Sequence, residues 1–227
     1  AILKSIEEQG KLTKELASQI NNSWDINEIE DLYLPYKPKR RTRAEIAREL
    51  GLEPLAKILM AQHENNVEKA ANSFVKGTVK TIDEALQGAR DIVAEWISEN
   101  ARVRNAMRNI FEREAFISSK VVKGKEKEGE KYQDYFDTKD LLRKCSSHRL
   151  LAMRRGENEG FLKVSIAPDE DKTIESIEKI VIKGFWQSSE QVRMALVDSY
   201  KRLLRPSIET EFASISKAKA DDEAIKV

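Results

Sequence analysis

Hydrophobic residues recur every three or four positions along most of the chain, which is the spacing of one face of an α-helix. The first such groups are Ile2, Leu3 and Ile6, then Leu12, Leu16 and Ile20, with Gly10 as a helix stop between them. The pattern predicts further helices over residues 25–33, from Thr42 to Gly51, from Pro54, over 82–97, over 103–111, over 173–182 and over 189–204. Pro206 is expected to kink or restart the last helix.

Two sequence signals mark helix starts. Thr42-Arg-Ala-Glu45 and Thr81-Ile-Asp-Glu84 are capping boxes, in which a Thr hydroxyl and a Glu carboxylate satisfy free backbone amides at the first turn. Asp25 is expected to cap the third helix, and Ser147 to cap a short helix that ends near Gly156.

Two segments have strand-like composition. Residues 116–122 are rich in β-branched and aromatic side chains, and residues 161–166 alternate apolar with polar positions. We expect these two strands to pair antiparallel. The predicted fold is mainly α and multi-helical, with a helix-turn-helix-containing N-terminal part (residues 1–115) and a central helical part with a small antiparallel strand pair (residues 116–227).

Composition narrows the protein class. Forty Lys and Arg against 39 Asp and Glu leave a net charge of +1, which excludes a uniformly basic polyanion-coating protein. Aromatic residues are only 7% of the chain, so an all-β fold is disfavoured. The single cysteine, Cys145, excludes a disulfide framework. Trp24, Trp96 and Trp186 lie on or beside apolar helical positions, and we expect core or interhelix packing for each.

The strongest chemical signal is a basic segment, residues 37–43, directly before a predicted helix. It places five cations in seven residues: Lys37, Lys39, Arg40, Arg41 and Arg43. Lys and Arg neutralise phosphates without reading base sequence, and Tyr33 and Tyr36 nearby are candidates for base stacking. The alternative is a solvated basic face paired with carboxylates such as Glu28, Glu30 and Asp31.

Residues 45–56 have the spacing of a helix-turn-helix, with Ala47 four residues before Gly51. Lys57 stands where that motif usually has a branched apolar residue, so an ordinary helical hairpin is the alternative. Arg149, Arg154 and Arg155 form a second, weaker candidate group for anion binding.

The sequence offers no catalytic constellation. Ser147 next to His148 in sequence is not a nucleophile with its base, because that pair needs through-space geometry and an orienting acid. Cys145 and the two histidines are too few ligands for a closed zinc site. Gly124–Gly129 lacks the Lys and Ser or Thr of a phosphate loop. We therefore expect no enzyme activity, no cofactor and no metal.

Targeting signals are also missing from the sequence. The first residues, AILKSIEEQG, contain no signal-peptide pattern, and apolar runs are too short for a transmembrane helix. We expect a cytoplasmic protein that does not partner with a membrane. The absence of an initial Met suggests a fragment of a longer chain.

Several blocks resemble the bacterial Tex family of transcription accessory proteins. The longest runs from Glu30 to Ala56 and includes Leu-Tyr-Leu-Pro-Tyr-Lys-Pro-Lys-Arg-Arg-Thr-Arg; shorter ones are residues 2–13, 89–92, 134–137, 147–156 and 202–207. The resemblance implies an N-terminal helical part with a helix-turn-helix, followed in the full protein by an RNase H-like domain, helix-hairpin-helix motifs and an OB-type RNA-binding domain that lie outside this sequence.

Residues and resemblance together lead to one functional expectation. The chain is expected to be a non-catalytic part of a Tex-like protein that contributes architecture and sequence-independent phosphate contacts, with RNA or DNA, and also the transcription machinery, as partners in the full-length protein. The rival expectation is a protein–protein or interdomain scaffold that does not contact nucleic acid directly.

Overall fold

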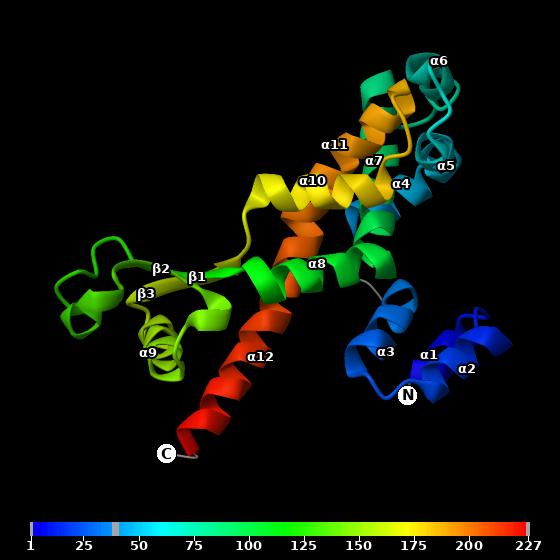
Figure 1. Ribbon diagram of the computed structural model, residues 1–227. Coiled ribbons are helices and arrows are strands. Elements are labelled where there is room, and N and C mark those ends of the chain that lie inside the picture. The colour runs from blue at the N-terminus through cyan, green and yellow to red at the C-terminus, as the bar shows by residue number, and fades with distance from the viewer. Residues whose placement is uncertain (1, 38–40, 226–227) are drawn as a thin grey trace. The chain divides into compact units, whose positions relative to one another are not determined.

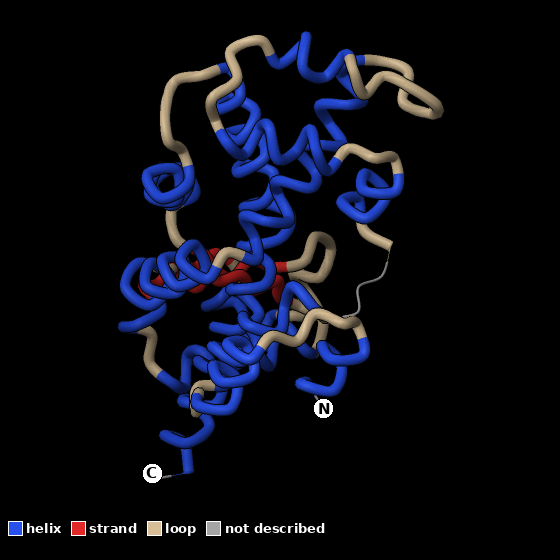
Figure 2. Tube along the Cα trace, turned by 90° about the vertical axis from the view of Figure 1, so that its right-hand side faces the viewer, coloured by secondary structure: helices blue, strands red, loops and turns tan. Residues whose placement is uncertain are grey.

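The protein is described by a computed structural model that covers residues 2–37 and 41–225 (Figure 1). Within these residues the fold is mainly helical with one small sheet, as predicted, and Figure 2 shows how few residues are in strands. The helices are α1 (Ile2–Glu8), α2 (Lys14–Asn22), α3 (Ile26–Tyr33), α4 (Arg43–Glu49), α5 (Glu53–Ala61), α6 (Val67–Asn72), α7 (Ile82–Glu99), α8 (Ala101–Glu114), α9 (Ser147–Asn158), α10 (Glu170–Val181), α11 (Gln187–Ser199) and α12 (Arg205–Ile225). The strands are β1 (Phe116–Val121), β2 (Asp137–Leu141) and β3 (Leu162–Ala167).

The chain divides into two compact units that interleave along the sequence. The first contains the residues up to Arg104 together with Glu178–Ser199, and the second contains Asn105–Ile177 together with the residues from Tyr200 onward. The predicted division at residue 115 stays a prediction about domains. Sequence order gives no sign that α11 returns to the first unit.

Helices α1 to α3 share a small apolar cluster of their own. Ile6, Leu16 and Ile20 are its buried members, and Tyr33 and Tyr36 pack against it. The predicted cap of α3 is confirmed, since the carboxylate of Asp25 accepts the backbone N–H of Asn27 at 2.9 Å. The tyrosines are therefore part of a core, and the Tyr33 hydroxyl lies 3.1 Å from the Ser5 hydroxyl.

Helix α7 is the centre of the first unit, and α4, α5, α6 and α11 contact it. Its predicted start is confirmed, because the Thr81 hydroxyl accepts the backbone N–H of Glu84 at 3.1 Å. Leu52, between α4 and α5, is buried over Gly88 of α7. A Cβ at Gly88 would lie 2.3 Å from the Leu52 Cδ1 atom, so the missing side chain lets this hairpin approach α7 closely.

The sheet of the second unit has the order β2-β1-β3, and both pairings are antiparallel. The predicted pairing of the segments at 116–122 and 161–166 is confirmed as β1 with β3. Strand β2 was not predicted, because its sequence Asp-Thr-Lys-Asp-Leu has no alternating apolar face. Helices α9 and α12 both contact β3.

The edge strand β3 has partners for its outward backbone amides. Glu157 of α9 accepts the N–H of Val164 at 3.3 Å, and Glu209 of α12 accepts the N–H of Ile166 at 2.7 Å. Unpaired amides on an edge strand are a template for pairing with another chain. The two carboxylates take the acceptor positions at Val164 and Ile166, which disfavours strand addition at this part of the edge.

The helical path from α11 to α12 changes its winding near Pro206. Residues Tyr200–Leu204 form a π-helical turn immediately before α12. Proline has no N–H and its ring conflicts with the carbonyl four residues earlier, here that of Arg202. A wider turn accommodates the ring, which agrees with the predicted disturbance at this proline.

Three sequence expectations about individual side chains are wrong. Trp24 is 97% exposed and Trp186 is 43% exposed, so neither packs in the interior as predicted. Both stand outside helices, in segments where helical periodicity no longer indicates which side is buried. Ser147 is also not the cap of α9, since Ser146 holds that position and the Ser147 hydroxyl bonds to Glu223 instead.

Candidate nucleic-acid interface

The structure describes three of the five cations of the basic segment 37–43. Lys37, Arg41 and Arg43 are exposed, whereas Lys39 and Arg40 lie outside the described residues. Lys37 follows a 3₁₀ turn (Leu34–Tyr36) and its N–H bonds to the carbonyl of Tyr33 at 3.0 Å. The described cations therefore stand at solvent-facing positions at the two ends of the segment.

Arg41 is not an unpaired cation. Its Nη2 atom donates to Oε2 of Glu49 at 2.6 Å, across α4, and the two side chains remain 69% and 50% exposed. Exposed ion pairs contribute only about 0–1 kcal/mol, because water screens both charges. A phosphate can therefore compete with the Glu49 carboxylate for Arg41. Among the described cations of the segment, Arg41 has Glu49 as its carboxylate partner. Pairing of the segment with Glu28, Glu30 or Asp31 stays a prediction, because Lys39 and Arg40 lie outside the described residues.

The start of α4 is held to α7 by a buried carboxylate. Glu95 of α7 accepts the Thr42 hydroxyl at 3.3 Å and pairs with Arg48 of α4 at 2.8 Å. The Thr42 hydroxyl also accepts the N–H of Glu45 at 3.1 Å, which is half of the predicted capping box. The other half is not formed by Glu45, whose carboxylate lies 3.5 Å from Arg48. This network fixes where the basic segment enters the helical unit.

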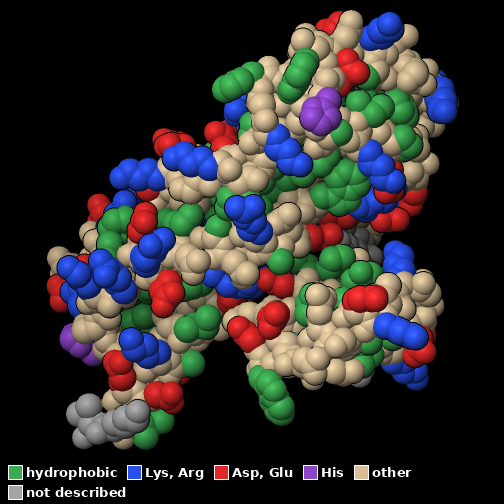
Figure 3. Space-filling view, turned by 45° about the vertical axis from the view of Figure 1, so that its right-hand side comes forward, with side chains coloured by type: hydrophobic (Ala, Val, Ile, Leu, Met, Phe, Trp, Pro, Cys, Tyr) green, Lys and Arg blue, Asp and Glu red, His purple; other side chains and the backbone are tan. Residues whose placement is uncertain are grey.

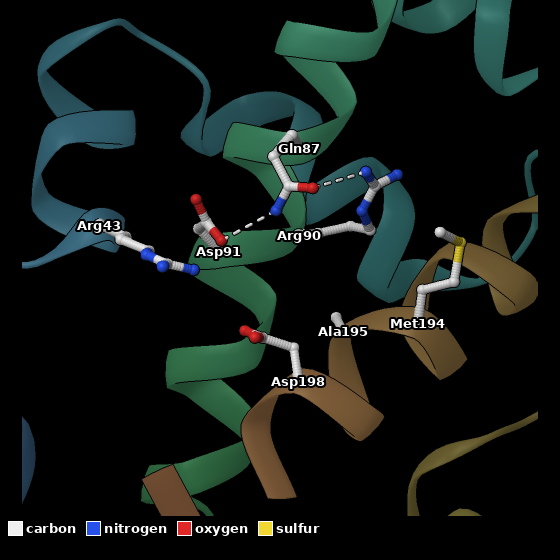
Figure 4. Close-up of a pocket in the computed structure, with 7 residues that line it drawn as sticks. All are labelled: Arg43, Gln87, Arg90, Asp91, Met194, Ala195 and Asp198. Atoms are coloured by element: carbon white, nitrogen blue, oxygen red, sulfur yellow. Dashed lines mark hydrogen bonds between the residues drawn. The ribbon is translucent and has the colours of Figure 1, made fainter. Parts of the chain in front are cut away.

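Arg43 reaches a pocket of about 480 Å³ in the first unit, between α4, α7 and α11 (Figure 4). The other charged side chains that line it are Arg90, Asp91 and Asp198. Gln87 links two of them, because it accepts from Arg90 at 2.9 Å and donates to Asp91 at 3.1 Å. Burial lowers the pKa of Arg90, while nearby Asp91 and Asp83 oppose that shift. Two cations and two carboxylates balance, so the pocket itself has no preference for an anion.

The second candidate group is not brought together. Arg149, Arg154 and Arg155 are on α9, and at 100° per residue neighbouring members of the group point about 100–140° apart around the helix. Arg149 pairs with Asp140 at 2.7 Å, and Arg154 pairs with Glu157 at 2.7 Å. Arg155 is exposed. A single phosphate cannot contact all three side chains.

The predicted helix-turn-helix segment is a helical hairpin of α4 and α5 joined at Gly51, which has a φ of +76°. Lys57 is exposed, and its ammonium lies 3.7 Å from Glu53. Leu55, Ala56 and Leu59 are the buried residues of α5. Base reading by this hairpin stays a prediction.

Neither a metal cluster nor a reactive thiol is visible in the described part of the chain. No group of three or more His, Cys, Asp and Glu side chains is positioned there to hold a metal ion. Burial, and then the charge of Asp140, raises the pKa of the Cys145 thiol, which keeps it protonated at neutral pH. None of the described helices combines the length and hydrophobicity needed to span a membrane.

Charge is mixed on the face that Figure 3 shows. On the face in Figure 3, Lys and Arg side chains stand among Asp and Glu side chains instead of forming one continuous basic area. Any interaction with a polyanion therefore depends on local clusters of cations.

Comparison with known proteins finds relatives that align with the whole chain. Residues 62–227 match the family described as Tex central region-like. The chain is 41% identical over 232 residues to the transcriptional accessory protein Tex of Neisseria gonorrhoeae, and 42% identical over 243 residues to protein YhgF of Escherichia coli strain K12. Both alignments cover 100% of this chain and 31% of the relative.

A more distant relative is named after an RNA-binding domain. The chain is 27% identical over 243 residues to the human S1 RNA-binding domain-containing protein 1, an alignment that covers 98% of this chain and 24% of that protein. The chain thus spans about a third, or less, of these relatives.

Proposed function

Because the chain belongs to the Tex family of transcription accessory proteins, we propose that it is a non-catalytic, architectural part of such a protein that contacts nucleic-acid phosphates through the basic segment 37–43. These contacts are independent of base sequence, and RNA or DNA is the partner in the full-length protein. The family assignment supports the transcription role, and the segment's chemistry supports the phosphate contacts.

The observation that carries this proposal is the exposure of Lys37, Arg41 and Arg43 at both described ends of a segment with five cations in seven residues. A chain with a net charge of +1 attracts a polyanion only where cations gather locally. The segment is the densest such run in the sequence. Its one described ion pair, between Arg41 and Glu49, is exposed and therefore exchangeable.

The test is fluorescence anisotropy of the 227-residue chain with labelled single-stranded RNA and duplex DNA across a salt series. The test variant carries Lys39→Gln, Arg40→Gln and Arg41→Gln. A matched control carries Lys11→Gln, Lys14→Gln and Lys76→Gln, which removes the same charge from exposed positions elsewhere in the first unit.

Each phosphate that the segment neutralises contributes about 0.7–0.9 to the slope of log affinity against log salt. We expect the test variant to lose affinity and slope on both nucleic acids, and the control variant to retain both. Equal binding by the two variants, or no binding at low salt by a folded chain, contradicts phosphate contact by this segment.

One observation favours a second candidate function, an interaction scaffold. Phe185 is fully exposed and Trp186 next to it is 43% exposed, in the loop before α11. Adjacent exposed aromatic side chains are typical of protein interfaces. Binding of the chain to purified RNA polymerase that Phe185→Ser abolishes, without nucleic acid present, would support the scaffold; no binding to the polymerase would contradict it.

A further inference from the structure

One face of the three-stranded sheet in the second unit has three exposed lysines, one on each strand. They are Lys120 of β1, Lys139 of β2 and Lys163 of β3. Side chains alternate between the two faces of a sheet, and directly opposed residues share a face. Lys120 is directly opposite Lys163, and Lys139 is directly opposite Ser118, which is two residues from Lys120. The three lysines therefore share one face.

The other face of the sheet belongs to the core. Ile117, Val164 and Ile166 point to that side and are buried, and α9 and α12 pack on β3 (Figure 1). Thr138 of β2 and Met153 of α9 approach on the same side, with 3.8 Å between Oγ1 and the sulfur. The lysine face is the opposite side of the sheet, which these residues do not cover. The lysine ammonium groups therefore remain solvated.

The three lysines of this face outnumber its acidic strand residues, of which Asp137 is the one example. Within the described residues, neither Lys120, Lys139 nor Lys163 forms an ion pair, whereas Lys131 nearby pairs with Glu159 at 2.5 Å. Asp137 is the one acidic strand residue on the face, and it stands opposite Lys120. Like charges directly opposite on neighbouring strands are destabilising, and this is the arrangement of Lys120 and Lys163. A bound anion between them would remove that repulsion.

An aromatic ring lies within the same face. Phe116 is half-buried at the start of β1, and the ammonium of Lys139 lies 4.5 Å from the centre of its ring. Ser118 and Ser165, directly opposite one another, place two hydroxyl groups between the ring and the Lys120–Lys163 pair. The face therefore combines cations, hydroxyl donors and a ring on one side of the sheet.

We propose that this open sheet face, formed by Lys120, Lys139 and Lys163 with Phe116, is a binding surface for single-stranded nucleic acid. Strands lie about 4.8 Å apart, so the three lysines cover roughly 10 Å across the sheet and contact successive phosphates of one chain. Single strands suit an open sheet face because their bases are free to lie against rings and their backbone bends to follow the cations. The proposal does not depend on the basic segment 37–43, which belongs to the first unit.

The experiment compares two triple variants of the 227-residue chain by anisotropy with fluorescein-labelled oligouridylate RNA over a salt series. The test variant carries Lys120→Gln, Lys139→Gln and Lys163→Gln. The matched control carries Lys127→Gln, Lys172→Gln and Lys219→Gln, which are exposed lysines of the second unit outside the strands. Thermal unfolding of both variants checks that the sheet is intact.

Three lost phosphate contacts predict that the slope of log affinity against log salt becomes shallower by about 2 in the test variant, since each contributes about 0.7 on single strands. The control variant should keep the slope of the unmodified chain. Equal slopes in the test variant and the unmodified chain would overturn the proposal.

Photo-crosslinking with 5-bromouridine RNA gives a readout of position that separates this face from the basic segment. We expect crosslinked peptides from residues 116–121, 137–141 or 162–167, and these should persist in the Lys39→Gln, Arg40→Gln, Arg41→Gln variant. Crosslinks confined to peptides of the first unit would overturn the sheet-face proposal and leave the proposal for segment 37–43 standing. RNA binding that is lost in the Lys39→Gln, Arg40→Gln, Arg41→Gln variant and retained in the sheet variant would likewise overturn the sheet-face proposal.

Discussion

The carboxylate of Glu209 in α12 accepts the backbone N–H of Ile166 in β3 at 2.7 Å. Together with Glu157, which accepts the N–H of Val164, it provides acceptors for two amides on the β3 edge of the sheet that a fourth strand would otherwise pair. The contact also joins residues that are 43 positions apart in the chain. It therefore ties the last helix to the sheet through the backbone as well as through side-chain packing.

Glu209→Ala should destabilise the chain by about 1–3 kcal/mol, because it leaves the N–H of Ile166 without its acceptor. Glu209→Gln should cost less, since the amide oxygen still accepts the bond. Asp222→Ala on the same helix is exposed and is the control, expected within about 0.5 kcal/mol of the unmodified chain. Urea unfolding measures all three. An equal loss in the Ala and Gln variants would show that charge, and not hydrogen bonding, is the contribution.

A buried ion pair connects α3 to the start of α8. Arg104 Nε donates to Asp31 at 2.7 Å, and the two side chains are 7% and 6% exposed. Removing one partner of such a pair leaves a buried charge and costs about 3–5 kcal/mol. We expect Asp31→Ala and Arg104→Met each to show this loss by urea unfolding. The double variant should lose much less than the sum of the two, and simple additivity would contradict the pairing.

The reactivity of Cys145 tests the electrostatics around η3, the 3₁₀ turn Leu142–Lys144. Burial, followed by the charge of Asp140, raises the pKa of this thiol, so the neutral form is favoured in the folded chain. Because the thiolate is the reactive form, alkylation by iodoacetamide should accelerate only at a higher pH than for a free cysteine. The rate against pH measures this directly, since Cys145 is the single cysteine.

Asp140→Asn is the matched variant for that measurement. The substitution removes the Asp140 carboxylate, whose charge raises the pKa of Cys145. It also releases Arg149 from its ion pair with Asp140, and the charge of Arg149 lowers the pKa of Cys145. The midpoint of the alkylation profile should therefore move to lower pH. A midpoint that stays unchanged or moves upward would contradict the assigned causes.

The Arg41–Glu49 pair offers a gain-of-binding test for the basic segment. Glu49→Gln removes the carboxylate that competes with phosphate for Arg41. Affinity for RNA should rise, and the salt slope should steepen by up to about 0.7–0.9, equivalent to one more phosphate contact. Glu68→Gln, an exposed carboxylate on α6, controls for the change in net charge. An equal effect of both variants would indicate general electrostatics and not contact at Arg41.

The fold could be predicted where local patterns decide it. The caps at Asp25, Thr42 and Thr81 and the amphipathic stripe of α7 are short-range signals, and the structure has helices at all of them. Strand β2 could not be found in this way, because its residues are held by pairing with β1 and not by a hydrophobic pattern. The exposure of Trp24 and Trp186 was missed for a related reason, since helical spacing carries no information in a loop.

Of the candidate site, the sequence could identify composition but not geometry. Five cations within seven residues are visible in the sequence of 37–43, whereas the partner of Arg41 is eight residues away and is brought to it only when α4 forms. Arg149, Arg154 and Arg155 are close in sequence but point to different sides of α9. The reverse holds for Lys120, Lys139 and Lys163, which are scattered in sequence and meet only through strand register.

The return of residues 178–199 to the first unit has a consequence for how the chain is made. The Gln62 side chain donates to the carbonyl of Val181 at 2.9 Å, and the Ser199 hydroxyl donates to the carbonyl of Ala94 at 2.7 Å. During vectorial synthesis on the ribosome, α7 emerges long before α11. The apolar surface of α7 that α11 covers in the finished fold therefore stays exposed until α11 has been made. The first unit to begin folding is therefore completed only after most of the second has been translated.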